Sequence, residues 1–244
     1  MKKHAFIGVA LNKVNPFYYG GWGGELTQTH NDLNKAIYTL CKPNTKTIIL
    51  KDELATIETF MIELLNLNLR KGDLLDIYYS GHGTNVPDTN NDEEDLQDEA
   101  YCFYNGLLLD DSLNYFITTR LDNGITIRLW SDCCHSGSIS RDYNNNLKPK
   151  HIEYQKSFRV STLSNVSKPL VQKVYSISAC MDHEVAYEGS NGGVFTEAFT
   201  TALNANKNMT FNKLRKELTK VKGQTPMITG YNLNFLGMYA KVIQ

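Results

Sequence analysis

Residues 124–137 read GITIRLWSDCCHSG, an apolar run that turns directly into small and reactive side chains. Upstream, residues 73–83 read DLLDIYYSGHG and show the same pattern, an apolar run followed by small residues, with His82 between two glycines. Short apolar runs bounded by turn residues are typical of buried strands. The sequence therefore predicts two buried strands, each followed at once by a residue able to do chemistry, His82 in one case and Cys134 in the other.

Short apolar runs alternate with longer stretches of helical periodicity along the chain. Parallel strands joined by crossover helices produce this alternation, with helices on both faces of the sheet. We expect an α/β fold with a mostly parallel central sheet, formed by residues 1–244 as a single domain. Strands are expected at residues 4–11, 45–50, 73–79, 124–130 and 173–179, and helices at residues 25–40, 53–69, 110–120, 193–205 and 210–221.

The composition excludes several classes of protein. Of the 244 residues, 41% are hydrophobic and 21% are charged, as in a globular chain and unlike a disordered one. The net charge of −1 argues against a nucleic-acid partner held by a broad basic surface. No apolar run reaches the ~18 residues of a membrane helix, so no membrane partner is expected. Five cysteines without a Cys-x-x-Cys pair indicate reduced thiols and a cytoplasmic location.

His82 and Cys134 form a candidate dyad. In an open parallel sheet the carboxyl ends of the strands meet at one crevice, so the two side chains are expected to face each other. A thiolate is a strong nucleophile, and an imidazole can take or return the proton. The separation of 52 residues agrees with the ~50 of caspase-type proteases. Either residue alone would more often be structural, but the pair indicates a cysteine peptidase.

The motifs at residues 79–83 (YSGHG) and 132–137 (DCCHSG) resemble the two signature motifs of the metacaspases. Residues 176–180, 192–196 and 224–226 resemble landmarks of the small subunit of that family. The resemblance implies a caspase–haemoglobinase fold and a cysteine endopeptidase with His82 and Cys134 as its dyad. It also implies an oxyanion hole formed by the amides of Gly83 and Cys134.

Cys134 is preferred over Cys133 as the nucleophile, since the family's nucleophile immediately precedes the histidine of the second motif. Neighbours on an extended segment point to opposite faces, so Cys133 is expected to face away and His135 is a poor partner. Adjacent ligands cannot easily surround one ion, which argues against zinc at residues 133–135.

In the family, positions that align with Asp32, Ser80 and Asp132 line the primary specificity pocket. Two carboxylates in a half-buried pocket need a cation, and a substrate Arg or Lys supplies one. We therefore expect protein or peptide substrates cut after Arg or Lys. The alternatives are a surface helix residue for Asp32 and a turn former for Asp132. Thr29 and Cys133 depart from the residues usual in the family.

Calcium activation is expected from the resemblance, with ligands that align with Asp98, Asp110 and Asp111; no organic cofactor is implied. Residues 88–99 carry seven carboxylates and no basic residue, which also suits a hard cation. Asp88, Asn90, Asp92 and Glu99 partly fit an EF-hand loop, but Glu93 replaces its glycine. The alternative is a solvated loop in which Asp110 caps a helix.

Residues 138–172 are too long and irregular for an ordinary connection. They lie between a region like the large subunit (1–137) and one like the small subunit (173–244). This linker carries six basic residues and is either a self-cleavage site or a tolerated insertion: Arg141, Lys148, Lys150, Lys156, Arg159 and Lys168. We expect a monomer.

Two other functions compete with the peptidase. Residues 20–24 (GGWGG) lie where a dinucleotide-binding loop would, but their spacing does not match Gly-x-Gly-x-x-Gly. A caspase-like scaffold that binds partners without catalysis is the second alternative, and it ranks below the enzyme because both dyad residues are present.

Overall fold

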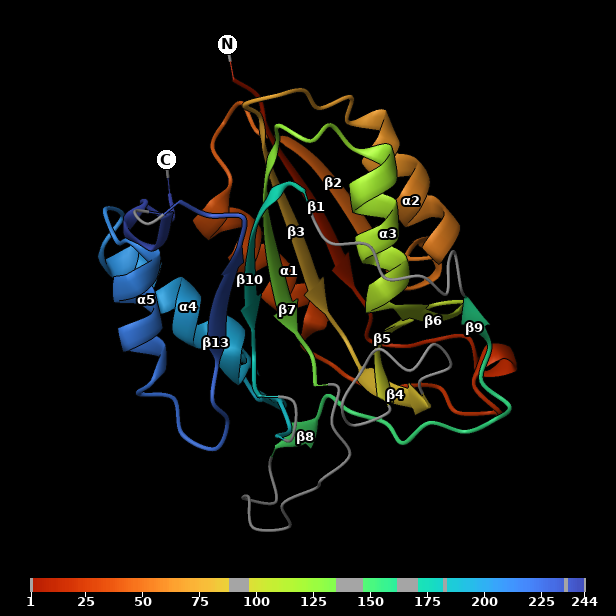
Figure 1. Cartoon of the computed structure of the whole chain (residues 1–244). Coiled ribbons are helices and arrows are strands. Elements are labelled where there is room, and N and C mark those ends of the chain that lie inside the picture. The colour runs from red at the N-terminus through yellow and green to blue at the C-terminus, as the bar shows by residue number, and fades with distance from the viewer. Residues whose placement is uncertain are drawn as a thin grey trace.

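The computed structural model describes residues 2–87, 97–134, 147–161, 171–181, 184–234 and 237–243. Its centre is a six-stranded sheet with the order β13-β10-β7-β3-β1-β2 (Figure 1). All neighbours pair in parallel except β13, which is antiparallel to β10. The strands are β1 (His4–Ala10), β2 (Lys46–Lys51), β3 (Leu74–Ser80), β7 (Thr126–Asp132), β10 (Lys173–Ser178) and β13 (Met227–Tyr231).

The α/β fold with a mostly parallel sheet is confirmed. Each of the five expected strands lies within two residues of its predicted bounds. Strand β13 was not predicted, because its short MITGY run ends in three exposed residues and carries little apolar signal. It pairs antiparallel with β10 and forms one edge of the sheet.

Helices cover both faces of the sheet and bury two separate cores (Figure 1). One core receives Phe60 from α2 and Phe116 from α3, and the other receives Leu33 from α1 and Phe199 from α4. Apolar stripes at helical spacing explain this packing, since they bury one side of each helix. The helices are α1 (Thr29–Leu40), α2 (Ile57–Asn66), α3 (Asp110–Arg120), α4 (Val194–Ala205) and α5 (Phe211–Leu218).

Two helices begin four residues later than expected, and each has a local cause. The Glu188 carboxylate accepts hydrogen bonds from the Thr27 and Gln28 amides, both at 2.8 Å, just before α1. The Thr56 hydroxyl caps α2 by accepting from the Thr59 amide at 3.1 Å, as N-caps commonly do. A short 3₁₀ helix, Asp52–Leu54, precedes that cap.

Two small sheets lie outside the central one and were not predicted. One has the order β4-β5-β6-β9 and the other β12-β11-β8. The 138–172 linker contributes to both small sheets, because it supplies β8 and β9. The strands are β4 (Gly83–Pro87), β5 (Gln97–Phe103), β6 (Gly106–Leu109), β8 (Lys148–Pro149), β9 (Val160–Ser161), β11 (Tyr187–Gly189) and β12 (Gly192–Gly193), and 3₁₀ helices lie at Pro16–Tyr18 and Gly237–Tyr239.

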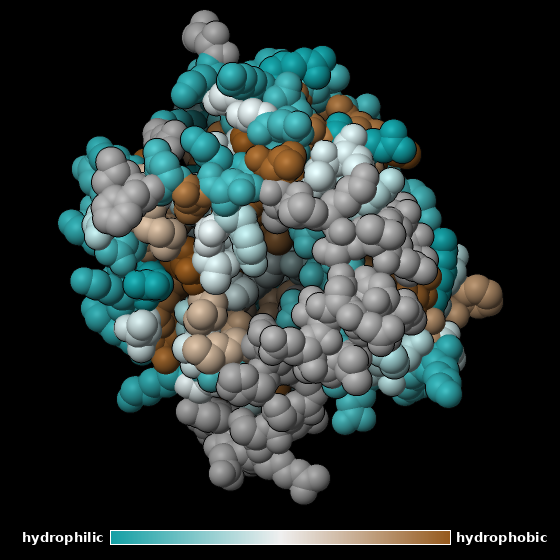
Figure 2. Space-filling model, in the orientation of Figure 1, coloured by the Kyte–Doolittle hydropathy of each residue, from teal (hydrophilic) through white to brown (hydrophobic). Residues whose placement is uncertain are grey.

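On the face shown in Figure 2, hydrophilic residues cover much of the periphery and hydrophobic residues form small separate patches. Within the described part of the chain, none of the helices has the length and apolar character needed to span a bilayer.

Candidate active site

His82 and Cys134 follow two neighbouring strands at the same edge of the sheet. Strands β3 and β7 pair in parallel with Ser80 opposite Asp132, and His82 and Cys134 each come two residues later. The amides of Gly83 and Cys134 converge on one acceptor, the carbonyl oxygen of Lys150, at 3.1 and 3.2 Å. Two amides aimed at one oxygen are the geometry of an oxyanion hole. The two strand ends therefore meet, as the sequence pattern indicates.

The His82 imidazole is buried, and the edge of its ring packs against Trp22 at 4.8 Å between centroids. Burial lowers the pKa of His82 to about 3, assisted by the charges of Lys150 and His151. Within the described residues neither ring nitrogen has a hydrogen bond of ordinary geometry, although the backbone of His151 is near enough to oppose the pKa shift. The imidazole is therefore neutral at pH 7 as long as His82 stays buried.

Cys134 and Cys133 point to opposite sides of the sheet, as expected of neighbours on an extended segment. Cys133 packs in the core with α2 and α3, and Cys134 packs in the core with α1 and α4. The Cys134 thiol donates a hydrogen bond to the Glu184 carbonyl, and the Cys180 thiol donates to the same oxygen at 3.5 Å. The nucleophile predicted from the motif thus lies on the side of the sheet that also carries Asp32.

Asp32, Ser80 and Asp132 form one buried pocket, and Lys150 fills it. The ammonium nitrogen of Lys150 lies 3.0 Å from Asp32 Oδ2 and 3.1 Å from Asp132 Oδ2. It donates to Ser80 Oγ at 3.0 Å, and Ser80 Oγ donates to Asp32 at 3.1 Å. All four residues have 0% exposure. Lysine is almost never fully buried unless it is paired, so these carboxylates are what hold it.

Residues of β12 and α4 complete the pocket. The Gly193 amide donates to Asp32 Oδ1 at 2.8 Å, and the Thr196 hydroxyl donates to Asp132 Oδ2. A Cβ atom at Gly193 would lie 2.0 Å from Asp132 Oδ2 and 2.6 Å from Lys150 Nζ. Only glycine leaves room here for a cation between the carboxylates.

The charges in the pocket shift each other's ionisation. Two carboxylates share one ammonium, and this raises the pKa of Lys150 although burial alone would lower it. Burial and the neighbouring Asp32 raise the pKa of Asp132, even though Lys150 opposes that shift. The pocket therefore holds a cation firmly and has one carboxylate that is not fully compensated.

The alternative interpretations of Asp32 and Asp132 are wrong. Asp32 is fully buried rather than at the surface of its helix, and Asp132 ends β7 rather than forming a turn. Thr29, where the family often has cysteine, bonds to Asn12 Oδ1 through its amide and hydroxyl. Trp22 and Lys150 were not predicted as site residues, because one aromatic residue among glycines and one lysine among six basic residues carry no distinguishing signal.

The expected calcium ligands lie near one another. Asp110 and Asp111 begin α3, and Asp98 lies on the neighbouring strand β5. Burial and the charges of Glu99, Asp111 and Asp98 raise the pKa of Asp110. The donor chemistry suits a hard cation, but no three His, Cys, Asp or Glu side chains are arranged to hold a metal within the described ranges.

Three alternatives from the sequence are excluded by the fold. Residues 88–96 lie outside the described residues, but strands β4 and β5 flank them, whereas helices flank an EF-hand loop. The start of α1, where a dinucleotide phosphate would bind, is occupied by the Glu188 carboxylate. Zinc at residues 133–135 conflicts with the opposite directions of Cys133 and Cys134, and His135 is outside the described residues.

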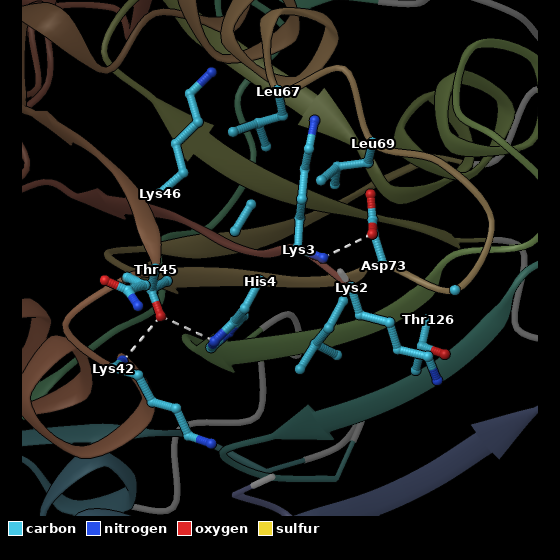
Figure 3. A pocket seen from close by; sticks show the side chains of 14 residues that line it. Lys2, Lys3, His4, Lys42, Thr45, Lys46, Leu67, Leu69, Asp73 and Thr126 are labelled. Carbon is cyan, nitrogen blue, oxygen red and sulfur yellow. Dashed lines mark hydrogen bonds between the residues drawn. The ribbon is translucent and has the colours of Figure 1, made fainter.

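A hollow of about 690 Å³ lies at the other end of the sheet (Figure 3). Its lining includes Lys2, Lys3 and Lys46 at the amino ends of the strands, where the Lys3 amide donates to Asp73 at 2.8 Å. Because the dyad lies beyond the carboxyl ends, this hollow is separate from it. A smaller hollow of about 470 Å³ includes Trp22 and His82 in its lining.

The comparisons with known proteins agree with the geometry. The family model described as "Caspase domain" matches residues 10–235. Metacaspase-2 of Trypanosoma brucei brucei is 24% identical over 250 residues, covering 86% of this chain and 70% of the relative. Metacaspase-1 of Plasmodium falciparum is 30% identical over 131 residues, covering 51% of this chain and 20% of the relative.

The crystal structure of protein GSU0716 from Geobacter sulfurreducens has the same fold. Its TM-score is 0.82 at 24% identity, with 97% of this chain and 96% of that chain covered. The family match spans most of the chain, including both strand ends that carry the site. The chain therefore belongs to the caspase-domain family and is a metacaspase-type cysteine endopeptidase.

Proposed function

We propose that the enzyme cleaves peptide bonds after Lys or Arg, with Cys134 as the nucleophile and His82 as its proton-transfer partner. The observation that carries the proposal is the buried contact of a lysine ammonium with Asp32 and Asp132. The carbonyl oxygen of that same lysine accepts from the two amides of the oxyanion hole. A substrate residue with a basic side chain would satisfy both sets of groups at once.

The proposed reaction follows from the positions of these groups. The Cys134 thiolate attacks the carbonyl carbon, and charge develops on an oxygen that faces the amides of Gly83 and Cys134. His82 receives the thiol proton and passes it to the departing amine. Water then hydrolyses the thioester and restores the thiol.

The pocket also supports a preference for Arg over Lys. Asp132 Oδ1 is buried and has no hydrogen-bond partner among the described residues. A lysine ammonium has three donors, whereas a guanidinium has five in a planar fork that suits carboxylates. We therefore expect Arg peptides to be cut faster than Lys peptides.

Turnover of matched peptides with Arg, Lys or Asp before the cut tests the proposal. We expect cleavage of the Arg and Lys peptides and none of the Asp peptide. Cys134→Ala should abolish turnover, and Cys133→Ala is the matched control because Cys133 faces the other core. Turnover that survives in Cys134→Ala, or a preference for Asp, would contradict the proposal. A folded protein that cuts none of the peptides would favour the scaffold alternative.

We also propose that Ca²⁺ binds near the start of α3. The support is the raised pKa of Asp110, which is buried and is repelled by the charges of Glu99, Asp111 and Asp98; a divalent cation would relieve that repulsion. Thermal melting should then rise with added Ca²⁺ but not with Mg²⁺, and Asp98→Asn should lose the response. Glu217→Gln on α5, which changes an exposed carboxylate, is the control. An unchanged melting temperature would refute calcium binding. The monomeric state and the cytoplasmic location stay predictions from the sequence.

A further inference from the structure

The indole of Trp22 packs edge to face against the imidazole of His82. Their ring centroids lie 4.8 Å apart, and the ring planes make an angle of 68°. Both residues also line the hollow of about 470 Å³. Aromatic rings attract one another in this arrangement, so the contact favours one orientation of the imidazole over the others.

The protein core holds Trp22 in place. Tyr19 is fully buried, and its ring packs against the indole at 5.8 Å between centroids. The Tyr19 hydroxyl donates to the Gly106 carbonyl at 2.8 Å, where β6 begins. The Trp22 amide donates to the Tyr19 carbonyl at 3.1 Å. The indole is therefore fixed from the core outward and can in turn fix a ring that packs against it.

The glycines on both sides of Trp22 make this placement possible. Gly21 and Gly24 have φ angles of +96° and +66°, a region that other residues rarely adopt. A Cβ atom at Gly24 would lie 3.3 Å from the indole, so the backbone of the loop passes close to the ring. The GGWGG stretch, whose spacing does not match a dinucleotide-binding loop, thus places one aromatic ring beside the imidazole.

Hydrogen bonds of ordinary geometry do not orient the imidazole within the described part of the chain, where neither ring nitrogen of His82 has a partner. In hydrolases with a thiol or hydroxyl nucleophile, a third group commonly orients the base by bonding to it. Lys148, Lys150 and His151 act on His82 through their charges, but the two ammonium groups cannot accept a bond from the ring. Glu25 lines the same hollow without bonding to the ring. Packing against Trp22 is therefore the contact that remains to orient it.

The backbone of His82 is fixed separately from its ring. The Tyr79 hydroxyl and the Cys102 amide donate to the His82 carbonyl at 2.7 and 3.1 Å. We propose that Trp22 is a positioning residue, whose indole holds the His82 imidazole in the orientation that proton transfer needs. This inference rests on the proposed function, because it assumes that His82 exchanges protons with Cys134 and with the departing amine.

Steady-state kinetics of the full chain with an Arg peptide test the role of Trp22. Trp22→Ala should lower kcat about 10- to 100-fold with KM nearly unchanged, because misplacing a reacting group by about 1 Å can reduce the rate by as much as 10²-fold. Trp22→Phe, which keeps an aromatic ring, should restore most of the activity. Tyr18→Ala is the matched control and should match the parent, because Tyr18 is a partly buried aromatic residue of the same segment that contacts Arg159 instead.

A second substrate separates positioning of the imidazole from general damage to the fold. In an aryl ester of an N-acylated arginine the leaving group departs without a proton, whereas the amine of a peptide needs one from His82. Trp22→Ala should therefore lower kcat/KM for the Arg peptide about tenfold more than kcat/KM for the aryl ester. Circular dichroism and melting show whether the variant is folded. Trp22→Leu, which keeps apolar volume without a ring, provides the same comparison if Trp22→Ala does not fold.

The outcomes distinguish this inference from the proposed function. A folded Trp22→Ala or Trp22→Leu protein with the kcat of the parent would overturn the positioning role and leave the peptidase proposal standing. Equal losses on the peptide and the aryl ester, or a raised KM with unchanged kcat, would also overturn it, since Trp22 would then act on the fold or on substrate binding. A parent that cuts no peptide after Arg or Lys would overturn the proposed function and this inference with it.

Discussion

Two buried charge clusters lie on the same pair of strands, and they differ in where the cation comes from. In the middle of the sheet, Asp76 on β3 pairs with Arg128 on β7, its partner in register. Four residues further along, Ser80 and Asp132 face each other in the same ladder, but their cation is Lys150 from the linker. Both cations are buried, and both have carboxylate partners.

The origin of the cation indicates what each cluster is for. Arg128 cannot leave Asp76 without the sheet coming apart, because both residues lie inside paired strands. The indole of Trp130 and the ring of His4 also bond to Asp76, at 2.8 and 2.7 Å. Lys150 belongs to the linker rather than to a paired strand, so the proposed basic side chain of a substrate could take its place without opening the sheet. The first cluster should therefore matter for stability and the second for substrate binding.

Removing one carboxylate from each cluster tests this contrast most strongly. Asp76→Asn leaves the Arg128 guanidinium buried without its partner, and such a loss costs about 3–5 kcal/mol of unfolding free energy. Asp132→Asn should lower the unfolding free energy by less than half as much, because the Lys150 ammonium retains Asp32 and Ser80 as partners. Denaturant unfolding of both variants measures the difference. Equal losses would contradict the division of roles.

The same two substitutions should have the opposite order in catalysis. Asp132→Asn removes a charge-assisted contact with the basic side chain, worth about 1.5–3 kcal/mol, so kcat/KM for an Arg peptide should fall about 10- to 150-fold. Asp76→Asn should leave kcat/KM per folded molecule unchanged. Both are measured in Lys150→Ala chains, whose pocket is open. A comparable loss in Asp76→Asn would show that the clusters are not independent.

Acid should also separate the clusters. Burial alone would raise the pKa of Asp76, but Arg128 and His4 bring it below its ordinary value. Its contribution to stability is therefore complete above about pH 3.9 and is lost as the pH falls through the folded pKa. The pKa of Asp132 is raised, so protonation of Asp132 favours the folded state and stability falls as the pH rises towards that pKa.

Unfolding free energies from pH 3 to pH 7 measure these slopes. The advantage of the parent over Asp76→Asn should shrink below about pH 4, whereas its stability relative to Asp132→Asn should improve on acidification. Each unit of difference between folded and unfolded pKa corresponds to about 1.4 kcal/mol. Parallel curves for the two variants would show that the two carboxylates have equivalent surroundings.

The strands that carry the Asp76 cluster were easier to predict from the sequence than the residue that fills the pocket at Asp132. Strands β3 and β7 are continuous apolar runs, and such runs carry their own signal for burial. Their ends also placed His82 and Cys134 at one edge, because parallel strands leave no other arrangement. Strand β13 and the hairpin strands β4 and β5 escaped prediction, since half-exposed edge residues and a dense run of carboxylates hide strand periodicity.

The occupant of the pocket could not be predicted for a different reason. Asp32, Ser80 and Asp132 followed from the motifs and their alignment with the family, but Lys150 is one of six basic residues in the linker. Its position depends on main-chain bonds to Ala186 and Gly83, which lie on segments far away in sequence. Hydrogen bonds between segments that lie far apart along the chain leave no periodic pattern in its sequence. The same holds for Trp22, which reaches His82 from a glycine-rich loop.

The smallest expected effects come from the neutral hydrogen-bonding groups of the two clusters. Ser80→Ala removes one of the three contacts of the ammonium group, and a neutral hydrogen bond contributes about 0.5–1.5 kcal/mol, so kcat/KM for basic peptides should fall about 2- to 10-fold. Trp130→Phe removes the indole bond to Asp76 and should lower the unfolding free energy while leaving kcat/KM per folded molecule unchanged. Because Ser80 also donates to Asp32, its loss should raise KM more than it lowers kcat. A Ser80→Ala protein with reduced stability and unchanged KM would show that Ser80 contributes to folding rather than to substrate binding. Ser80, at the end of β3, would then belong to the structural cluster of Asp76.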